Sequence, residues 1–194
     1  MKKVLIIGGA GFIGSKLVKN LVNDYDVVVL DNFSIGSRDN LSDVKVNIQW
    51  GDITRFNELN IFINKIKPDT IINLAAWHFI PECIKNPAKT TLINVSGVKN
   101  LLQAISVNRL KPYIIFSSSA AVYKPKDGPL YESDPVGPIE IYGHSKLESE
   151  ELIEAFANDY GINYTIVRLF NVYGSGDHNN HIIPAIIRQM NNKG

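Results

Sequence analysis

Short apolar runs alternate with helical patterns along most of the chain. The runs at residues 3–8, 26–31, 70–76, 113–119 and 164–170 predict strands, and the first is consistent with a strand buried on both faces. A further run at residues 44–50 places apolar side chains at every second position. Such alternation is typical of a half-exposed strand, so we expect this one near a sheet edge.

Between these runs, apolar residues recur at helical spacing. One apolar stripe predicts a helix after the first run. Three more stripes predict helices at 56–66, 95–108 and 145–160, and Gly161 ends the last of these. The stripes are Leu17, Val18, Leu21 and Val22; Phe56, Leu59, Ile63 and Ile66; Val98, Leu101, Leu102 and Ile105; Leu152, Ile153, Phe156 and Tyr160. Alternating strands and helices predict an α/β fold, a Rossmann-type doubly wound parallel sheet with helices on both faces. Residues 124–140 contain four prolines and two glycines, which predicts a long loop.

Composition narrows the class of protein. Of 194 residues, 45% are hydrophobic and 20% charged, and the net charge of +1 gives no indication of nucleic-acid binding. No apolar stretch is long enough for a membrane span. The single cysteine, Cys83, excludes an internal disulfide and suits a reducing cytoplasm. His178 and His181 are three apart, but no cysteine supports them, and we expect no metal site.

A glycine-rich turn joins the first strand to the first helix. Gly8, Gly11 and Gly14 fit a turn whose backbone approaches a pyrophosphate, with the helix N-terminus stabilising the negative charge. Asp31 ends the second strand, where an acid binds adenosine ribose hydroxyls and repels a 2′-phosphate. The pattern favours NAD, while Arg38 keeps NADP open. A turn without a cofactor and a capping role for Asp31 are the structural alternatives.

Tyr142 and Lys146 lie four residues apart at the start of a predicted helix and therefore share a face. A neighbouring ammonium favours the phenolate and is expected to lower the tyrosine pKa, making a general base. Ser119, at the carboxyl end of the strand predicted at 113–119, is placed to hydrogen-bond a reacting hydroxyl. An exposed Tyr–Lys pair without function is the alternative.

Several motifs occur in a fixed order: GGAGFIG (8–14), LDNFSIGSRDNL (30–41), GDI (51–53), NLAA (73–76), NVSG (94–97), SSSAAVY (117–123), YGHSK (142–146) and RLFNVYG (168–174). Together they resemble the extended short-chain dehydrogenase/reductase family, in its nucleotide-sugar epimerase branch. The resemblance implies Ser119, Tyr142 and Lys146 as the catalytic residues. It implies that NAD contacts Gly8, Gly11, Phe12, Ile13 and Gly14 at the turn; Asp31, Asn32, Ser34 and Gly36 at the adenosine ribose; Asp52 and Ile53 at the adenine; Leu74, Ala75, Ala76, Asn94 and Ser117 on the way to the nicotinamide; and Tyr142, Lys146 and Phe170 beside it. Ser119, Tyr142 and Asn171 would contact the sugar nucleotide.

The resemblance also implies a reaction, epimerisation of a nucleotide sugar, UDP-hexose at C4. Tyr142 would remove the proton of the 4-hydroxyl while hydride passes to NAD, and hydride would return to the other face of a 4-keto sugar. Related 4,6-dehydratases carry Asp-Glu where this chain has Ala120 and Ala121, which favours epimerisation. A dehydrogenase, reductase or dehydratase, and a dinucleotide-binding module inactive through truncation, are the alternatives.

Family members usually carry a C-terminal substrate domain. We therefore expect residues 1–174 to form the NAD-binding domain with the catalytic residues, and 175–194 to begin a truncated substrate-binding domain. Trp77, His78 and Phe79 are expected near the nicotinamide. The helices at 95–108 and 145–160 resemble those of a homodimer interface in this family, although their apolar stripes could equally face the sheet.

Overall fold

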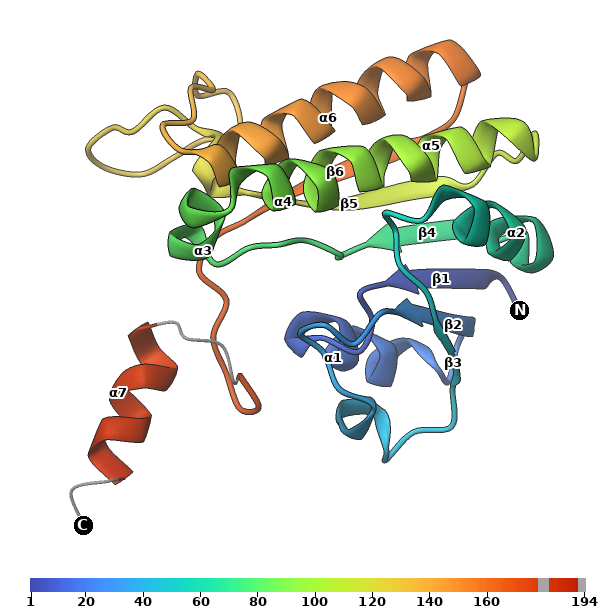
Figure 1. Cartoon of the computed structure of the whole chain (residues 1–194), viewed down its shortest axis with the longest axis horizontal. Helices are drawn as coiled ribbons and strands as arrows, with labels where there is room; N and C mark the ends of the chain where they lie inside the picture. Colours follow the sequence, from blue (N-terminus) through green and yellow to red (C-terminus); the bar gives the residue numbers. More distant parts are fainter. Residues whose placement is uncertain (178–181, 192–194) are drawn as a thin grey trace.

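The computed structural model describes residues 1–177 and 182–191. Its centre is a parallel sheet of six strands in the order β3-β2-β1-β4-β5-β6 (Figure 1). The strands are β1 (Lys3–Ile7), β2 (Asp26–Asp31), β3 (Asn47–Trp50), β4 (Thr70–Asn73), β5 (Tyr113–Ser119) and β6 (Tyr164–Leu169). This order is that of a doubly wound Rossmann fold, and it confirms the predicted fold class. The winding direction reverses between β1 and β4, where such sheets bind ligands.

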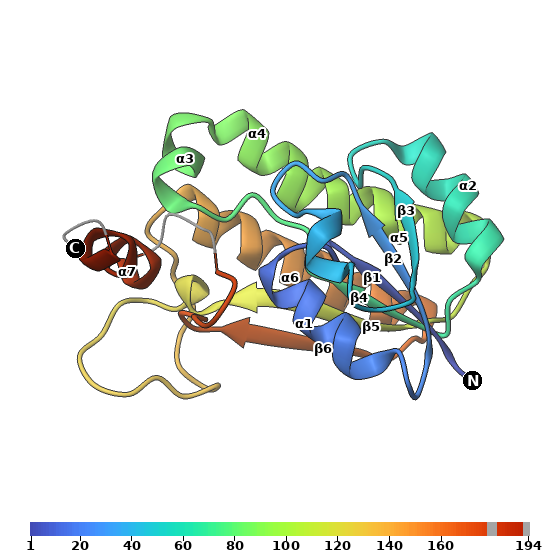
Figure 2. The ribbon, with the colours of Figure 1, turned by 90° about the horizontal axis from the view of Figure 1, so that it is seen from below.

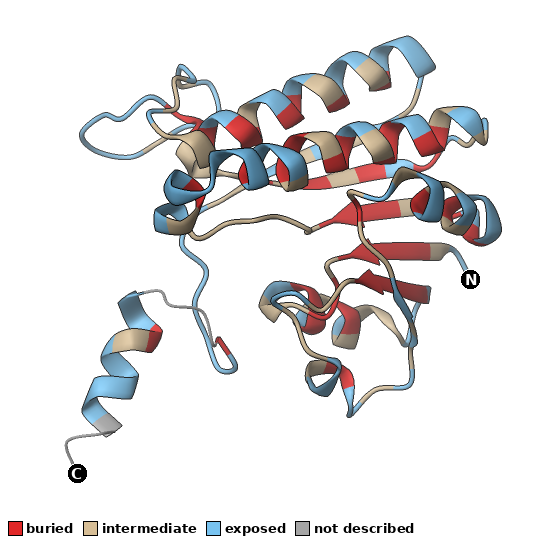
Figure 3. Cartoon of the chain, in the orientation of Figure 1, coloured by how far each residue is buried: buried red, intermediate tan, exposed pale blue. Residues whose placement is uncertain are grey.

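Helices cover both faces of the sheet (Figure 2). On one face, α2 (Phe56–Ile66), α5 (Gly97–Val107) and α6 (Ile141–Tyr160) pack in a cluster that includes Leu5 and Ile7 of β1. On the other, α1 (Phe12–Leu21) and the 3-10 turn η1 (Arg38–Leu41) pack with Val4 and Ile6. Successive side chains of β1 thus enter opposite layers, which explains the continuous apolar run. In Figure 3 the buried positions lie mainly in the central strands and on the sides of the helices that pack against them.

Strand limits differ from the predicted runs for local reasons. β1 ends at Ile7 because Gly8 has a φ of +80°, outside the extended region. β3 lies at the sheet edge as predicted, but it begins at Asn47 instead of residue 44. β4 ends at Asn73 and β6 at Leu169, so the segments that follow them lie outside the sheet and can line a site. Residues 124–140 contain no helix or strand, which confirms the loop; an isolated bridge joins Val136 to Tyr123.

Helix limits also depart from the sequence prediction. α6 starts at Ile141, four residues before the segment predicted at 145–160 but in agreement with a helix that begins at the Tyr142–Lys146 motif, and the Glu140 carboxylate caps it. It ends as predicted at Gly161, whose φ is +61°. Tyr160 was expected to face inward but is exposed and stacks on Phe156. Several short segments were not predicted: α3 (Ile80–Lys85), α4 (Pro87–Thr91), the π-helical turn η2 (Leu92–Ser96), the 3-10 turn η3 (Ala120–Val122) and α7 (Ile182–Asn191).

Within the described residues, no helix is long and apolar enough to cross a bilayer. The same residues contain no group of three His, Cys, Asp or Glu side chains able to hold a metal ion. His178 and His181, considered above for a metal, lie outside the described residues.

Candidate functional site

The glycine turn packs tightly between β1 and α1. A Cβ atom on Gly8 would lie 2.9 Å from the Ala75 nitrogen, and one on Gly14 would collide with the Gly8 carbonyl oxygen. Gly11, the N-cap of α1, has more room, since its nearest neighbour would be 3.4 Å away. The turn therefore exposes bare backbone at a helix N-terminus, which suits close approach of a phosphate.

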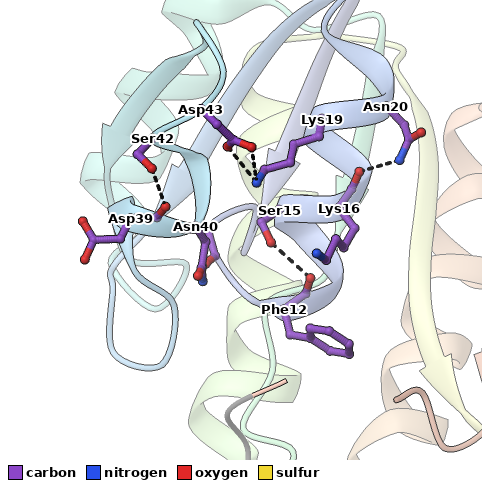
Figure 4. A network of polar contacts seen from close by, with 10 residues as sticks. Phe12, Ser15, Lys16, Lys19, Asn20, Asp39, Asn40, Ser42 and Asp43 are labelled. Atoms are coloured by element: carbon purple, nitrogen blue, oxygen red, sulfur yellow. Dashed lines mark hydrogen bonds and ion pairs between the residues drawn. The ribbon is translucent and has the colours of Figure 1, made fainter. Parts of the chain in front are cut away.

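The segment after β2 is fastened to this turn. Asp31 accepts hydrogen bonds from the backbone nitrogens of Ala10 (2.9 Å) and Phe33 (2.8 Å). Asn40 donates to the Ala10 carbonyl oxygen at 2.8 Å, so Ala10 is held from both sides. Farther along α1, Lys19 forms a 2.7 Å ion pair with Asp43 (Figure 4). Together these contacts fix the glycine turn relative to the Asp31 carboxylate.

Arg38, which left NADP as an alternative, stacks on a neighbouring ring. The Arg38 guanidinium stacks over the Phe33 ring, 4.8 Å from its centroid, and does not line the cavity described below. Asp31 does line it and keeps its carboxylate beside the turn. The Asp31 carboxylate at this end of the cavity disfavours a 2′-phosphate.

A cavity of about 750 Å³ runs along the carboxyl ends of the strands. Most of the predicted site residues line it: Gly8, Gly11, Phe12, Ile13, Gly14, Asp31, Ser34, Gly36, Leu74, Ala76, Ser117, Ser119, Tyr142, Lys146, Phe170 and Asn171. A smaller cleft of about 50 Å³ shares Gly8, Asp31 and Ser34 with it. The predicted residues Asn32, Asp52, Ile53 and Ala75 line this smaller cleft.

The Asp52 carboxylate is built into the wall of the smaller cleft. It accepts hydrogen bonds from Asn32 at 2.9 Å and from the Thr54 backbone nitrogen at 2.8 Å. Burial alone raises the pKa of Asp52, but the hydrogen bonds from Thr54 and Asn32 outweigh it and hold that pKa below its usual value. Asp52 is therefore an ionised acceptor at this end of the site.

Ser119, Tyr142 and Lys146 meet at the other end of the large cavity. Ser119 ends β5, and its side chain is near enough to the Tyr142 hydroxyl to favour the phenolate. Tyr142 lies in the first turn of α6, with Lys146 one turn farther on the same face. The Lys146 side chain is 2% exposed, and its ammonium lies 4.3 Å from the centroid of the Phe116 ring. The sequence prediction that these residues share one place is confirmed by this geometry.

The electrostatics of the pair differ from the expectation. Burial raises the pKa of Tyr142 to about 12, whereas the sequence argument expected a lowered value. Burial also lowers the pKa of Lys146 to about 7, so near neutral pH much of its charge is lost. The sequence showed that the two groups are neighbours, but it could not show how deeply the fold buries them.

The start of α6 is capped by its own Glu140 and packs closely on the segment after β5. The Glu140 carboxylate accepts hydrogen bonds from the backbone nitrogens of Tyr142 (2.7 Å) and Gly143 (2.8 Å). A side chain on Gly143 would collide with the Ala121 carbonyl oxygen, so only glycine permits this approach. The close approach keeps Tyr142 beside Ser119.

Asn94 is not among the residues that line either cavity, and its place on the cofactor path stays a prediction. It is buried and donates hydrogen bonds to the Trp77 carbonyl oxygen (3.0 Å) and to Ser145 Oγ (2.9 Å). Ser145 in turn donates to the Tyr142 carbonyl oxygen at 2.7 Å. Asn94 thus links the segment after β4 to the first turn of α6.

Some lining residues were missed or misplaced by the sequence argument. His78 and Phe79 line the large cavity as expected, but Trp77 lines the smaller cleft with Asp52. Further lining residues had not been predicted as contacts of cofactor or substrate: Ile35, Ile80, Pro81, Ser118, Ala120, Ala121, Leu169, Val172, Tyr173, Ile182, Ile183 and Pro184. Most of them follow strands β4, β5 and β6, and the rule that ligands bind beyond the carboxyl ends of strands would have found those.

A doubly wound sheet with a bare glycine turn at its switch point defines a dinucleotide-binding α/β protein. The chain belongs to the NAD dependent epimerase/dehydratase family, whose model matches residues 4–194. The family resemblance inferred from the motifs is thereby confirmed.

Individual relatives agree with this assignment. UDP-glucose 4-epimerase of Lactobacillus helveticus is 39% identical over 197 residues, which cover 96% of this chain and 59% of that protein. The crystal structure of UDP-glucose 4-epimerase from Brucella ovis in complex with NAD has a TM-score of 0.88 at 35% identity, covering 95% of this chain and 59% of that one. A dTDP-glucose 4,6-dehydratase from Streptomyces venezuelae has a TM-score of 0.89 at 30% identity, covering 99% and 63%. The chain thus spans about 59% of the length of the epimerases it matches.

Proposed function

We propose that this chain carries the cofactor-binding and catalytic part of an NAD-dependent nucleotide-sugar 4-epimerase acting on a UDP-hexose. One observation carries the proposal: Ser119, Tyr142 and Lys146 line the same cavity as the glycine turn and Asp31. A UDP-glucose 4-epimerase relative and an NAD complex of another such enzyme support the choice of substrate and cofactor.

The residues present fit NAD. The backbone of Gly8, Gly11 and Gly14 would take the pyrophosphate, and Asp31 the adenosine ribose. Asp52 and Ile53 of the smaller cleft would border the adenine, while Tyr142 and Lys146 would border the nicotinamide. When bound, NAD supplies a reversible hydride acceptor.

The chain's own side chains would handle the proton. Ser119 would orient the sugar 4-hydroxyl by a hydrogen bond, and Tyr142 would accept its proton. Because burial raises the pKa of Tyr142 to about 12, its phenolate needs a positive charge nearby. Lys146, one helical turn away, would supply that charge when protonated.

The lining of the cavity favours epimerisation over dehydration. Along the described residues that line it, Asp31 at the cofactor end is the one carboxylate. Ala120 and Ala121 line the catalytic end and offer no acid for eliminating water. This distinction matters because a 4,6-dehydratase matches the fold as closely as the epimerases do.

We also propose the domain limits expected from the sequence, residues 1–174 for NAD and catalysis and 175–194 as the beginning of a substrate-binding domain. In support, Ile182, Ile183 and Pro184 border the cavity from outside the sheet. A cytoplasmic location is proposed on the single, buried Cys83 thiol.

A homodimer through the helices at 95–108 and 145–160 stays a proposal. The apolar stripes of α5 and α6 face the sheet, whereas their outer sides carry polar contacts such as the Lys99–Glu148 ion pair. Sedimentation of the purified chain at several concentrations tests it, and a monomer at all of them would contradict it.

The test of function is cofactor extraction from the purified chain, followed by spectra during addition of UDP-glucose and UDP-galactose. Transient nicotinamide reduction and interconversion of the two sugars support the proposal. A dehydrogenase would instead accumulate reduced cofactor, and a dehydratase would yield a 4-keto-6-deoxy sugar. If NAD binds and neither sugar reduces it, a chain of the relatives' full length is tested next, and its failure to epimerise rejects the proposal.

A further inference from the structure

Glu150 is a buried acid behind the cavity. It stands one helical turn after Lys146 on α6, and it is 4% exposed. Its carboxylate accepts hydrogen bonds from Ser118 Oγ of β5 and from Arg168 of β6, the latter through Nη2 at 2.7 Å and Nε at 3.1 Å. Three elements therefore fix this carboxylate in place.

The charges of this cluster are held strongly. Hydrogen bonding to Glu150 raises the pKa of Arg168, so the guanidinium stays charged and favours an ionised carboxylate. Arg168 also stacks over the Tyr123 ring, 4.7 Å from its centroid. Stability gives little reason for this arrangement, because the cost of desolvating the Glu150 carboxylate offsets much of the gain from pairing it with Arg168, whose side chain is 24% exposed. The pair needs another explanation.

Lys146 offers that explanation. Its amine is buried against the Phe116 ring, and burial favours the neutral form. The negative charge that opposes this tendency is Glu150. Cys83 and Glu140 also act on Tyr142, and both raise the tyrosine pKa instead of helping it ionise.

We propose that Glu150 is a positioning residue for the Tyr142–Lys146 pair: its carboxylate, fixed by Ser118 and Arg168, keeps the buried Lys146 amine charged. The step from the Lys146 charge to proton transfer at Tyr142 rests on the proposed function. The effect on Lys146 itself does not, because it follows from the protein's own charges.

The test is an NMR titration of the full chain with lysine side chains labelled at Cε. The Lys146 resonance is assigned by its loss in Lys146→Met. Glu150→Gln keeps the shape and removes the charge, so the Lys146 midpoint should fall by about one pH unit. The matched control is Glu148→Gln, which removes an acid from the same helix at a site 49% exposed and paired with Lys99, and should leave the midpoint unchanged.

A second variant separates charge from loosened packing. Glu150→Asp keeps the carboxylate charge on a shorter side chain, so its Lys146 midpoint should lie above that of Glu150→Gln. An unchanged midpoint in Glu150→Gln overturns the proposal, as does a midpoint in Glu150→Asp as low as that of Glu150→Gln. If Glu150→Gln does not fold, the double variant Glu150→Met/Arg168→Met, which replaces the whole ion pair with apolar side chains, takes its place, and a midpoint there that is not lowered overturns the proposal.

The titration needs neither cofactor nor sugar, so the two proposals fail separately. Shifted midpoints without sugar turnover in the full-length chain would reject only the epimerase. Epimerisation together with an unmoved Lys146 midpoint would reject only the role of Glu150.

Discussion

Burial moves the pKa of Tyr142 up to about 12 and that of Lys146 down to about 7, although the two residues lie one helical turn apart. Both shifts favour the neutral form of the side chain. In the protein alone the pair is therefore poised between an uncharged state and one in which only Lys146 is charged. Small changes in nearby charge decide which state is populated near neutral pH.

Replacing Lys146 with methionine should change how stability depends on pH. The folded pKa of about 7 lies below the ordinary 10.5, so between these values the unfolded chain holds a proton that the folded chain lacks. The free energy of unfolding of the unmodified protein therefore rises with pH over this window. Lys146→Met lacks this slope.

Urea unfolding at a series of pH values from 6 to 10 measures the effect. Lys146→Met should be more stable by on the order of a few kcal/mol at pH 6, with the difference shrinking toward pH 10. The exposed lysine variant Lys85→Met should differ by a constant amount. A constant difference for Lys146→Met would contradict burial of its amine.

Tyr142→Phe should remove the proton acceptor while leaving the cavity intact. We expect hydride transfer to a UDP-hexose, measured by single-turnover absorbance in a chain competent for turnover, to fall by about 10²–10⁴-fold. NAD affinity should change by less than about threefold, since no phosphate contact is lost. Tyr131→Phe, in the exposed loop, is the control. Retained hydride transfer in Tyr142→Phe would show that another group accepts the proton.

The sheet and its main helices could be predicted because the spacing of apolar residues in each strand or helix matches the side that packs against a neighbouring layer of the fold. In β1, for example, alternate residues enter the two core clusters, and this produces an unbroken apolar run. The short helices α3 and α4 give no such period, since each spans six residues or fewer and has a proline among its first two residues. Tyr160 fits the helical stripe but lies at the last residue of α6, where the core has ended.

The site was predictable where one motif supplies both position and chemistry, as with Gly8, Asp31 and Tyr142. It was not predictable where partners are distant in the sequence. Asn94 meets Ser145 across 51 positions, and Glu150 meets Arg168 across 18 positions on another element. No local pattern encodes such a meeting, because it depends on how complete elements pack.

Asp31→Asn should weaken discrimination against NADP. The carboxylate lines the cavity beside the glycine turn, so its charge would repel a 2′-phosphate. We expect the ratio of NADP to NAD dissociation constants, measured by calorimetry, to fall by about tenfold. Asp39→Asn, an exposed acid of the same segment, should leave the ratio unchanged. An unchanged ratio in Asp31→Asn would exclude Asp31 from ribose recognition.

Gly11→Ala should separate binding from folding. The backbone of Gly11, with φ −73° and ψ 179°, accepts an alanine, and the added Cβ would meet its nearest atom at 3.4 Å. Because Gly11 lines the cavity, the methyl group would occupy space that the pyrophosphate needs. NAD affinity should fall by at least about tenfold while the thermal midpoint moves by only a few degrees. Gly174→Ala, whose Cβ would lie an ordinary 3.6 Å from the Phe12 ring, should change neither quantity. If Gly11→Ala binds NAD as tightly as the unmodified chain, the pyrophosphate does not lie on this turn.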